Sequence, residues 1–238
     1  MPRLEYVLAG IKRTEARKGP RPKQRLPITL DILLQLKAVW LSPPIHRDNI
    51  MLWSAACIAF FGFLRTGEFT VPSQRAYDPD VHLSLADVAI DSHVSPSLLR
   101  LQIKQSKTDP FRVGVNIFLG ATGAEVCPVT AFTQYMGVCN PLPGPLFVWA
   151  NGDPLSRSTL VSHLKAALQK AGIPHTNYNG HSFRIGAATT AAQRGLEDSL
   201  IQTLGRWKSA AYKTYIKLHR SQLASVSQVL ANKTQLAK

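Results

Sequence analysis

The apolar residues in the first third of the chain are spaced as in two helices. Thr29 and Asp31 give an N-cap signal just before the run ILLQLKAVWL, whose apolar positions recur at helical spacing. A second helix is expected from about His46 to Phe63. The stretch Ile50–Leu64 is the most apolar of the chain, but it is shorter than a bilayer span and is closed by Arg65. We therefore predict a buried helix and no membrane embedding.

The pattern changes to short apolar or alternating runs between residues 77 and 119. The segments SLADVAI (84–90), LLRLQIK (98–104) and FRVGVNIFL (111–119) are typical of strands, and turn residues separate them. Ser106–Pro110 supplies the turn between the last two. These runs predict a small three-stranded antiparallel sheet.

Helical spacing returns in the second half of the chain. Helices are expected over about 127–138, 156–171, 181–194, 197–204 and 209–232, the last with a break near Tyr215. Gly172 and Gly195 stand where C-terminal helix caps belong. The whole pattern predicts an α+β fold that is mainly α.

Residues 1–27 form a basic arm ahead of this fold. Their Lys and Arg residues alternate with Gly and Pro, which break helices, and like charges extend a chain. We therefore divide the chain into an arm, 1–27, and a folded domain, 28–238.

The charge of the chain indicates a polyanionic partner. It has 28 Lys and Arg against 14 Asp and Glu, a formal net charge of +14. Nucleic acid is the first candidate and an anionic membrane surface the second, because both offer phosphates to such a charge. The arm residues expected to bind are Lys12, Arg13, Arg17, Lys18, Arg21, Lys23 and Arg25.

The three cysteines, Cys57, Cys127 and Cys139, show no C-x-x-C spacing, and no signal peptide accompanies them. We expect free thiols in an intracellular protein. No carboxylate cluster at two-metal spacing and no Gly-rich phosphate loop is present, so neither a metal nor a cofactor is expected.

Two basic side chains, His181 and Arg184, lie three positions apart on a predicted helix and so on one face of it. An imidazole beside a guanidinium suits a phosphate clamp, because the guanidinium offers paired donors to two oxygens. Helices often carry such a pair by chance, and the pair alone does not establish a site.

Arg65 and Lys107 are two further candidates. Arg65 follows the apolar helix and could cap its last carbonyls, but Gly67 and Glu68 beside it could instead aim the guanidinium at a ligand. Lys107 lies in the predicted turn, where lysines are commonly solvated and where one could also deliver a proton.

Two tyrosines near the C-terminal end are candidate nucleophiles. Tyr215 follows Trp207, and Tyr212 is a rival one turn earlier. A phenol has a pKa near 10, so nearby cations are needed to favour the phenolate.

Five motifs together resemble the catalytic domain of the tyrosine recombinases, the phage integrase family. They are LRTGE (64–68), SKTDPFRVG (106–114), GHSFRIGAATTAAQRG (180–195), LGRW (204–207) and YKTYI (212–216), in the family's order. The resemblance spans about residues 28–225.

The resemblance implies a transesterification of DNA. Arg65 and Arg184 would hold the scissile phosphate while Tyr215 attacks it and leaves a 3′-phosphotyrosyl link. Lys107 would protonate the leaving 5′-oxygen, and His181 would assist proton transfer at the nucleophile.

The same resemblance implies supporting roles for two other residues. Trp207 stands where many members have a second His, and its indole can donate a hydrogen bond to the phosphate but cannot shuttle a proton. Glu68 would hold the side chain of Arg65 in position.

The chain departs from the family at its N-terminal end. The segment GIKRTEARKGPRPKQRLPIT resembles the linker and tail of the family's DNA-clamping domain, as in DIRS-type and Crypton-type eukaryotic mobile elements. We therefore expect a nuclear recombinase of mobile-element origin acting on double-stranded DNA. The alternatives are a DNA-binding protein that has lost catalysis and a type IB topoisomerase.

The resemblance also implies a homotetramer on DNA. Leu223, Val226, Val229 and Leu230 recur at helical spacing in the segment 220–238, which could pack into a neighbouring subunit or on its own domain.

Overall fold

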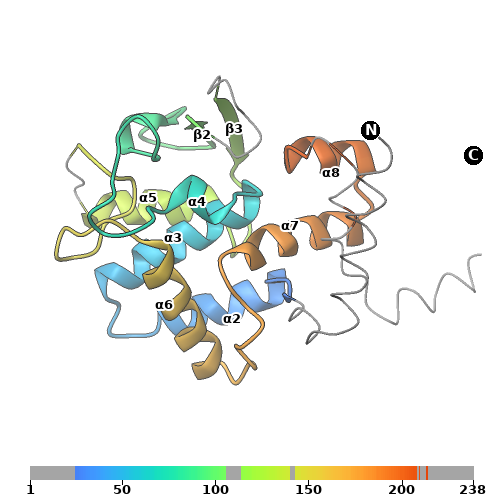
Figure 1. The fold of residues 1–238 in the computed structure, drawn as a ribbon, viewed down its shortest axis with the longest axis horizontal. Coiled ribbons are helices and arrows are strands. Elements are labelled where there is room, and N and C mark those ends of the chain that lie inside the picture. Colours follow the sequence, from blue (N-terminus) through green and yellow to red (C-terminus); the bar gives the residue numbers. More distant parts are fainter. Residues whose placement is uncertain (1–24, 106–113, 140–142, 208, 210–212, 214–238) are drawn as a thin grey trace, which may run out of the picture.

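The computed structural model describes residues 25–105, 114–139, 143–207, 209 and 213. A mainly helical domain carries one small sheet (Figure 1). Its helices are α2 (Leu30–Trp40), α3 (Arg47–Phe61), α4 (Thr66–Phe69), α5 (Pro128–Cys139), α6 (Arg157–Lys170), α7 (His181–Gln193) and α8 (Asp198–Leu204). Its strands are β1 (Val88–Ile90), β2 (Leu98–Ile103) and β3 (Val115–Gly120).

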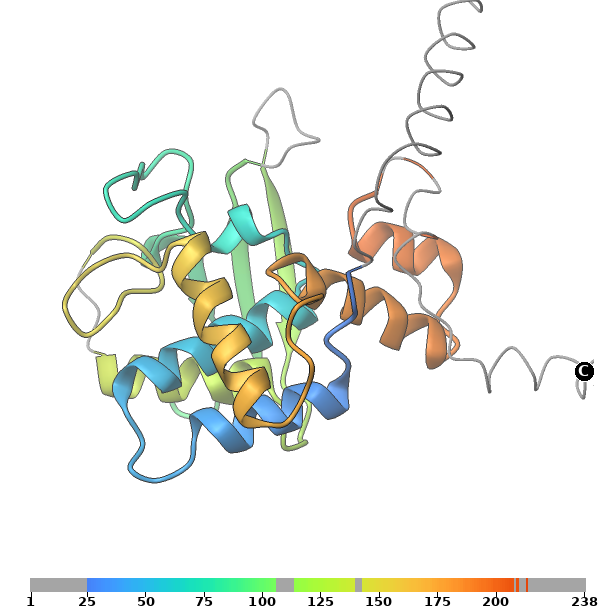
Figure 2. The ribbon, with the colours of Figure 1, turned by 60° about the horizontal axis from the view of Figure 1, so that its bottom comes forward.

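Helix α3 is the centre of the core. Every residue from Met51 to Phe60 is buried, as expected for a helix that is apolar on all sides. It packs against α2, α5 and α7, and the sheet lies on the side of α3 opposite to α6 (Figures 1 and 2). Neither α3 nor any other helix of the described residues is long and apolar enough to cross a membrane.

The sheet is antiparallel in the order β1-β2-β3, as predicted. The first strand is shorter than the predicted 84–90, because Leu85–Asp87 forms a 3₁₀ turn. The carboxylate of Asp87 accepts hydrogen bonds from the amide and the hydroxyl of Ser84, at 2.7 and 2.6 Å, and this closes the turn. Residues 106–113, which include the predicted hairpin turn, lie outside the described part.

The predicted helix ends are confirmed in most places. The hydroxyl of Thr29 accepts a hydrogen bond from the amide of Ile32 at 3.4 Å, so Thr29 is the N-cap of α2. Gly172 and Gly195 follow α6 and α7 with φ of 73° and 76°, which a residue with a Cβ rarely adopts. Helix α3 ends at Phe61 rather than Phe63. The three cysteines are free and buried, as predicted for the thiols.

The chain enters the domain along the start of α7. The amides of Leu26 and Ile28 donate hydrogen bonds to the carbonyls of Asn177 and Ser182, at 3.0 and 2.9 Å. The backbones pack so closely that a Cβ added to Gly186 would lie 1.7 Å from the Ile28 carbonyl oxygen. This contact places Arg25 beside the N-terminus of α7.

Candidate active site

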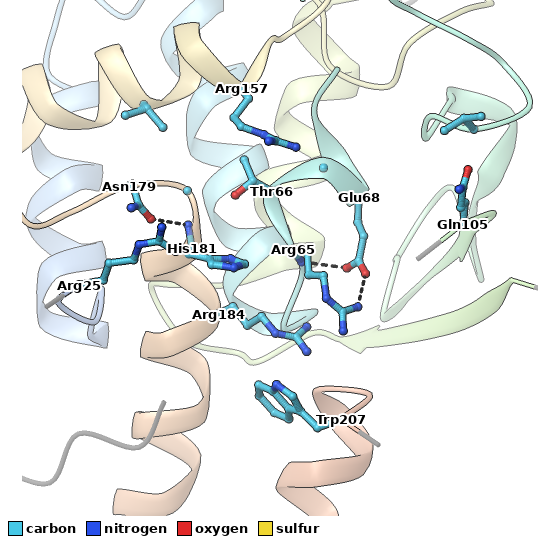
Figure 3. Close-up of a pocket in the computed structure, with 14 residues that line it drawn as sticks. Arg25, Arg65, Thr66, Glu68, Gln105, Arg157, Asn179, His181, Arg184 and Trp207 are labelled. Carbon is cyan, nitrogen blue, oxygen red and sulfur yellow. Dashed lines mark hydrogen bonds and ion pairs between the residues drawn. The ribbon is translucent and has the colours of Figure 1, made fainter. Parts of the chain in front are cut away.

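A cleft of about 740 Å³ opens where the start of α7 faces α4 and the turn after α8 (Figure 3). Segments far apart in the sequence contribute to it. Its lining includes Arg25, Arg65, Thr66, Glu68, Gln105, Arg157, Asn179, His181, Arg184 and Trp207. The cleft thus brings together four of the six predicted catalytic residues and the predicted supporting carboxylate.

The short helix α4 fixes the positions of Arg65 and Glu68. Arg65 is its N-cap residue, and the amide of Arg65 donates to Glu68 Oε2 at 2.8 Å, which is one half of a capping box. The same carboxylate accepts a hydrogen bond from Arg65 Nη1 through Oε1 at 2.9 Å. No described residue bonds to Arg65 Nη2 or Nε, and the side chain faces the cleft (Figure 3). Glu68 therefore orients Arg65, the arrangement that the resemblance implies.

Arg184 is the most deeply buried cation of the site, with 1% of its surface exposed. Its Nη1 donates to the carbonyl of Phe63, and its Nη2 donates to the carbonyl of Gly205. Each of these nitrogens carries two N–H groups, so a carbonyl takes one from each. The guanidinium is thereby held between the end of α3 and the turn after α8.

Trp207 covers the guanidinium of Arg184 from the other side (Figure 3). Its ring also meets the ring of Phe63 edge to face, with centroids 6.4 Å apart. A cation over an indole face is attracted by the ring quadrupole, the more so when both are desolvated. In the described residues Trp207 therefore has a packing role against Arg184.

His181 is the first residue of α7, and its amide donates to Asn179 Oδ1 at 2.9 Å. The pKa of His181 is lowered from 6.5 by burial, and further by the charges of Arg25, Arg184, Arg65 and Arg157. The imidazole is therefore neutral at neutral pH and able to accept a proton.

The cleft carries a strong positive charge. Four arginines line it, and Glu68 is the one carboxylate among the lining residues that the structure describes. Such a cluster favours an anion with several oxygens, because each guanidinium presents donors in a fixed plane.

Arg157 and Asn179 are among the lining residues that were not predicted from the sequence. Arg157 begins α6, and Asn179 lies just before α7. The N-cap Ser156 could have placed Arg157 in a first helical turn, but no sequence signal shows that this turn faces the cleft. Arg25, predicted as a DNA-binding residue of the arm, is also in the lining.

Several predicted residues lie outside the described part of the chain. They are Lys107, Tyr212, Tyr215 and the arm residues Lys12, Arg13, Arg17, Lys18, Arg21 and Lys23. The predicted helix over 209–232 lies outside it as well, apart from residues 209 and 213. Lys104, which precedes Lys107 by three positions in the sequence, forms an ion pair with the buried Asp87 at 2.7 Å.

The described residues contain no group of three or more His, Cys, Asp or Glu side chains that could hold a metal ion. The charged side chains that line the cleft are mainly guanidinium groups, which repel cations.

Comparison with known proteins gives consistent matches. Residues 100–220 match the Phage integrase family. An integrase/recombinase xerD homolog from Selenomonas ruminantium is 25% identical over 212 residues, which cover 85% of this chain and 57% of that protein. The chain thus spans little more than half the length of this curated relative.

Two solved structures share the fold. The crystal structure of XerA recombinase superposes with a TM-score of 0.64 and 17% identity, covering 90% of this chain and 67% of that one. A lambda integrase dimer bound to a COC′ core site gives a TM-score of 0.58 and 16% identity, covering 83% of this chain and 49% of the other. The predicted fold class, mainly α with a small antiparallel sheet, is confirmed.

Proposed function

The chain belongs to the phage integrase family, and from this premise we propose that it is a site-specific tyrosine recombinase that breaks and rejoins DNA through a 3′-phosphotyrosyl intermediate. The observation that carries the proposal is the pairing of Arg65 and Arg184 across one cleft, beside a neutral His181. Two guanidinium groups suit the two non-bridging oxygens of a phosphodiester.

The chemistry follows from these groups. As the nucleophile attacks, negative charge grows on the non-bridging oxygens, and fixed cations stabilise it most in a site that excludes water. Arg65 is held by Glu68 and Arg184 by two carbonyls, so neither has to reorganise during the reaction.

Proton transfer needs a base and an acid. The neutral His181 can accept the proton of the attacking phenol, to which we assign Tyr215. We assign the general acid for the 5′-oxygen to Lys107. The described lysine nearby, Lys104, is engaged by Asp87 and is a poor candidate.

Partner, organisation and origin are parts of the same proposal. The partner is double-stranded DNA, which residues 1–27 and the cleft arginines would bind, and residues 28–238 would be the catalytic domain. Two further structures with a similar fold are a XerH recombinase bound to its difH substrate and a lambda integrase tetramer bound to a Holliday junction. By analogy we propose a homotetramer on DNA, in a nuclear protein of DIRS-type or Crypton-type origin.

A covalent-adduct assay tests the function. The protein is incubated with nicked suicide duplexes, and protein–DNA adducts are sought on a denaturing gel. We expect an adduct that Tyr215→Phe abolishes and Tyr212→Phe preserves. The reverse result would assign the nucleophile to Tyr212, and duplex binding by the wild type without any adduct would favour a DNA-binding protein that has lost catalysis.

A second readout separates the recombinase from a type IB topoisomerase. Strand transfer between two duplexes is expected from a recombinase. Relaxation of supercoils without transfer would contradict it.

A further inference from the structure

Arg206 lies in the turn after α8 and contacts Glu68, which lines the cleft. Arg206 itself does not line the cleft, and only 14% of its side chain is exposed. Its Nη2 forms an ion pair with Glu68 Oε2 at 2.6 Å, shorter than the 2.9 Å contact between Arg65 and the other oxygen of that carboxylate. The short helix α4 and the turn after α8 are joined through this pair.

Main-chain contacts strengthen the same connection. Arg206 Nη1 donates to the carbonyl of Gly62 at 3.2 Å, and Nη2 lies 3.4 Å from the carbonyl of Phe63. The Phe63 carbonyl is also a partner of Arg184. Two arginines from different parts of the chain thus bind carbonyls of the turn that follows α3.

The backbone at both ends of this connection is unusual. Phe63 has a φ of 50° and Arg206 a φ of 55°, in the left-handed region that non-glycine residues rarely adopt. Such conformations persist where surrounding contacts hold them, and they concentrate at functional sites. The contacts of Arg206 and Arg184 supply that constraint here.

These contacts couple the position of Arg65 to the position of the turn after α8. Arg65 depends on Glu68, Glu68 is shared with Arg206, and Arg206 belongs to the turn from which the chain continues toward Tyr215. Trp207, the next residue of the turn, rests on Arg184. A displacement of this turn would therefore change the position from which the chain continues, relative to Arg65 and Arg184.

We propose that Arg206 is a positioning residue, a latch that ties the turn 205–207 to the Arg65–Glu68 pair and so fixes the point from which the chain continues toward Tyr215. This inference rests on the proposed recombinase function for its effect on catalysis. The latch itself is a property of the folded protein and is measurable without DNA cleavage.

The first measurement follows the turn directly. The indole N–H resonance of Trp207, assigned with Trp207→Phe, is recorded for wild type, Arg206→Ala, Arg206→Lys and the exposed-arginine control Arg194→Ala. We expect Arg206→Ala to move the resonance toward the position of a solvated indole and to speed its exchange with water. Arg206→Lys should lie in between, and Arg194→Ala should match the wild type. An unchanged resonance in folded Arg206→Ala would overturn the latch.

The second measurement is the single-turnover rate of adduct formation, taken well below the unfolding temperature of each variant. Misplacement of a reacting group by about 1 Å can cost roughly 100-fold in rate, which is the slowing expected for Arg206→Ala and for Glu68→Gln. The double variant should be little slower than Glu68→Gln alone, because that change already disturbs the contact that Arg206→Ala removes, together with the contact to Arg65. Duplex affinity should stay close to that of the wild type.

The other outcomes are equally decisive. Weaker duplex binding by Arg206→Ala, with a salt slope reduced by about one, would make Arg206 a phosphate contact and reject the positioning role. An unchanged rate in a variant that is only less stable would reduce Arg206 to a structural residue. If the wild type forms no adduct with any duplex, the proposed function fails, and the Trp207 resonance alone decides the latch.

Discussion

The guanidinium carbon of Arg184 lies 4.2 Å from the centroid of the Trp207 ring. Because Arg184 is buried and donates to two carbonyls through its guanidinium group, the indole completes the enclosure of the cation. An aromatic face in this place stabilises a buried charge that would otherwise be costly.

Loss of that ring should destabilise the domain. For Trp207→Ala we expect the free energy of unfolding to fall by about 3 kcal/mol, as for truncation of a large packed side chain. Trp207→Phe should lose less, since a phenyl face still attracts the cation. Urea denaturation measures both. Equal stability of Trp207→Ala and the wild type would mean that the stacking contributes nothing.

His181 should make stability depend on pH in a defined direction. Its pKa is lowered in the folded protein by burial and the surrounding arginines, so below about pH 6.5 the unfolded chain binds a proton that the folded protein does not. Stability should therefore fall as the pH drops through that value. In His181→Asn this part of the decline should disappear when chemical denaturation is compared at about pH 7.5 and about pH 5.5, on either side of the ordinary histidine pKa. A steeper decline in the variant would mean that folding raises the pKa of His181 instead of lowering it.

Because Gly186 packs against the backbone of Ile28, the addition of one methyl group at this position should lower stability strongly. A Cβ there would lie 1.7 Å from the Ile28 carbonyl oxygen, and backbone cannot move aside as a flexible side chain can. Gly186→Ala should cost about 1–3 kcal/mol of stability and displace Arg25 from the cleft. Thr190→Ala, on the same helix, is the matched control, because its hydroxyl has no hydrogen-bond partner in the described residues. Equal melting temperatures for both variants would refute the close contact.

The two lysines near the β2–β3 connection should behave differently. Lys107→Ala should slow adduct formation on ordinary DNA, and a sulfur in place of the bridging 5′-oxygen should restore the rate, because a thiolate leaves without a proton. Lys104→Ala should instead lower stability, since it leaves Asp87 buried without its ion pair. Rescue of Lys104→Ala but not Lys107→Ala by the sulfur substrate would exchange the roles.

The basic arm should contribute affinity rather than chemistry. Duplex binding should fall steeply between roughly 50 and 200 mM salt, and removal of residues 1–24 should weaken binding and make this dependence shallower. At saturating DNA the truncated protein should still form the adduct, because it retains Arg25 in the cleft. A salt response that the truncation leaves unchanged would show that the arm does not bind phosphates.

Elements set by local chemistry could be predicted from the sequence. Thr29 and Gly195 marked true helix ends because a hydroxyl cap and a left-handed glycine act within one turn. The segment 84–90 was only partly right, because Asp87 captures Ser84 and converts alternation into a 3₁₀ turn. Helix α4 was missed, since four residues show no periodicity.

The residues of the candidate site also fall into two groups, those that a motif identifies and those that depend on how distant elements pack. Arg65, His181 and Arg184 were identified through motif resemblance, and the fold gathers them in one cleft. Arg157 and Arg206 were not identified, because their approach depends on how α6 and the turn after α8 pack, which no local pattern encodes. The partner of Arg206, Glu68, was predicted to support Arg65 alone.

The left-handed backbone at Phe63 and Arg206 sets the local preference of the main chain against the packing of the two side chains. Glycine at either position would remove a conformational strain of roughly 1 kcal/mol or more. It would also remove a ring that meets Trp207 or a cation that meets Glu68. Truncation of the buried Phe63 ring costs about 3 kcal/mol or more, and loss of the Arg206 guanidinium leaves the buried Glu68 with one ion pair fewer. The side chains, and not the backbone preference, therefore decide which residues these two positions can keep.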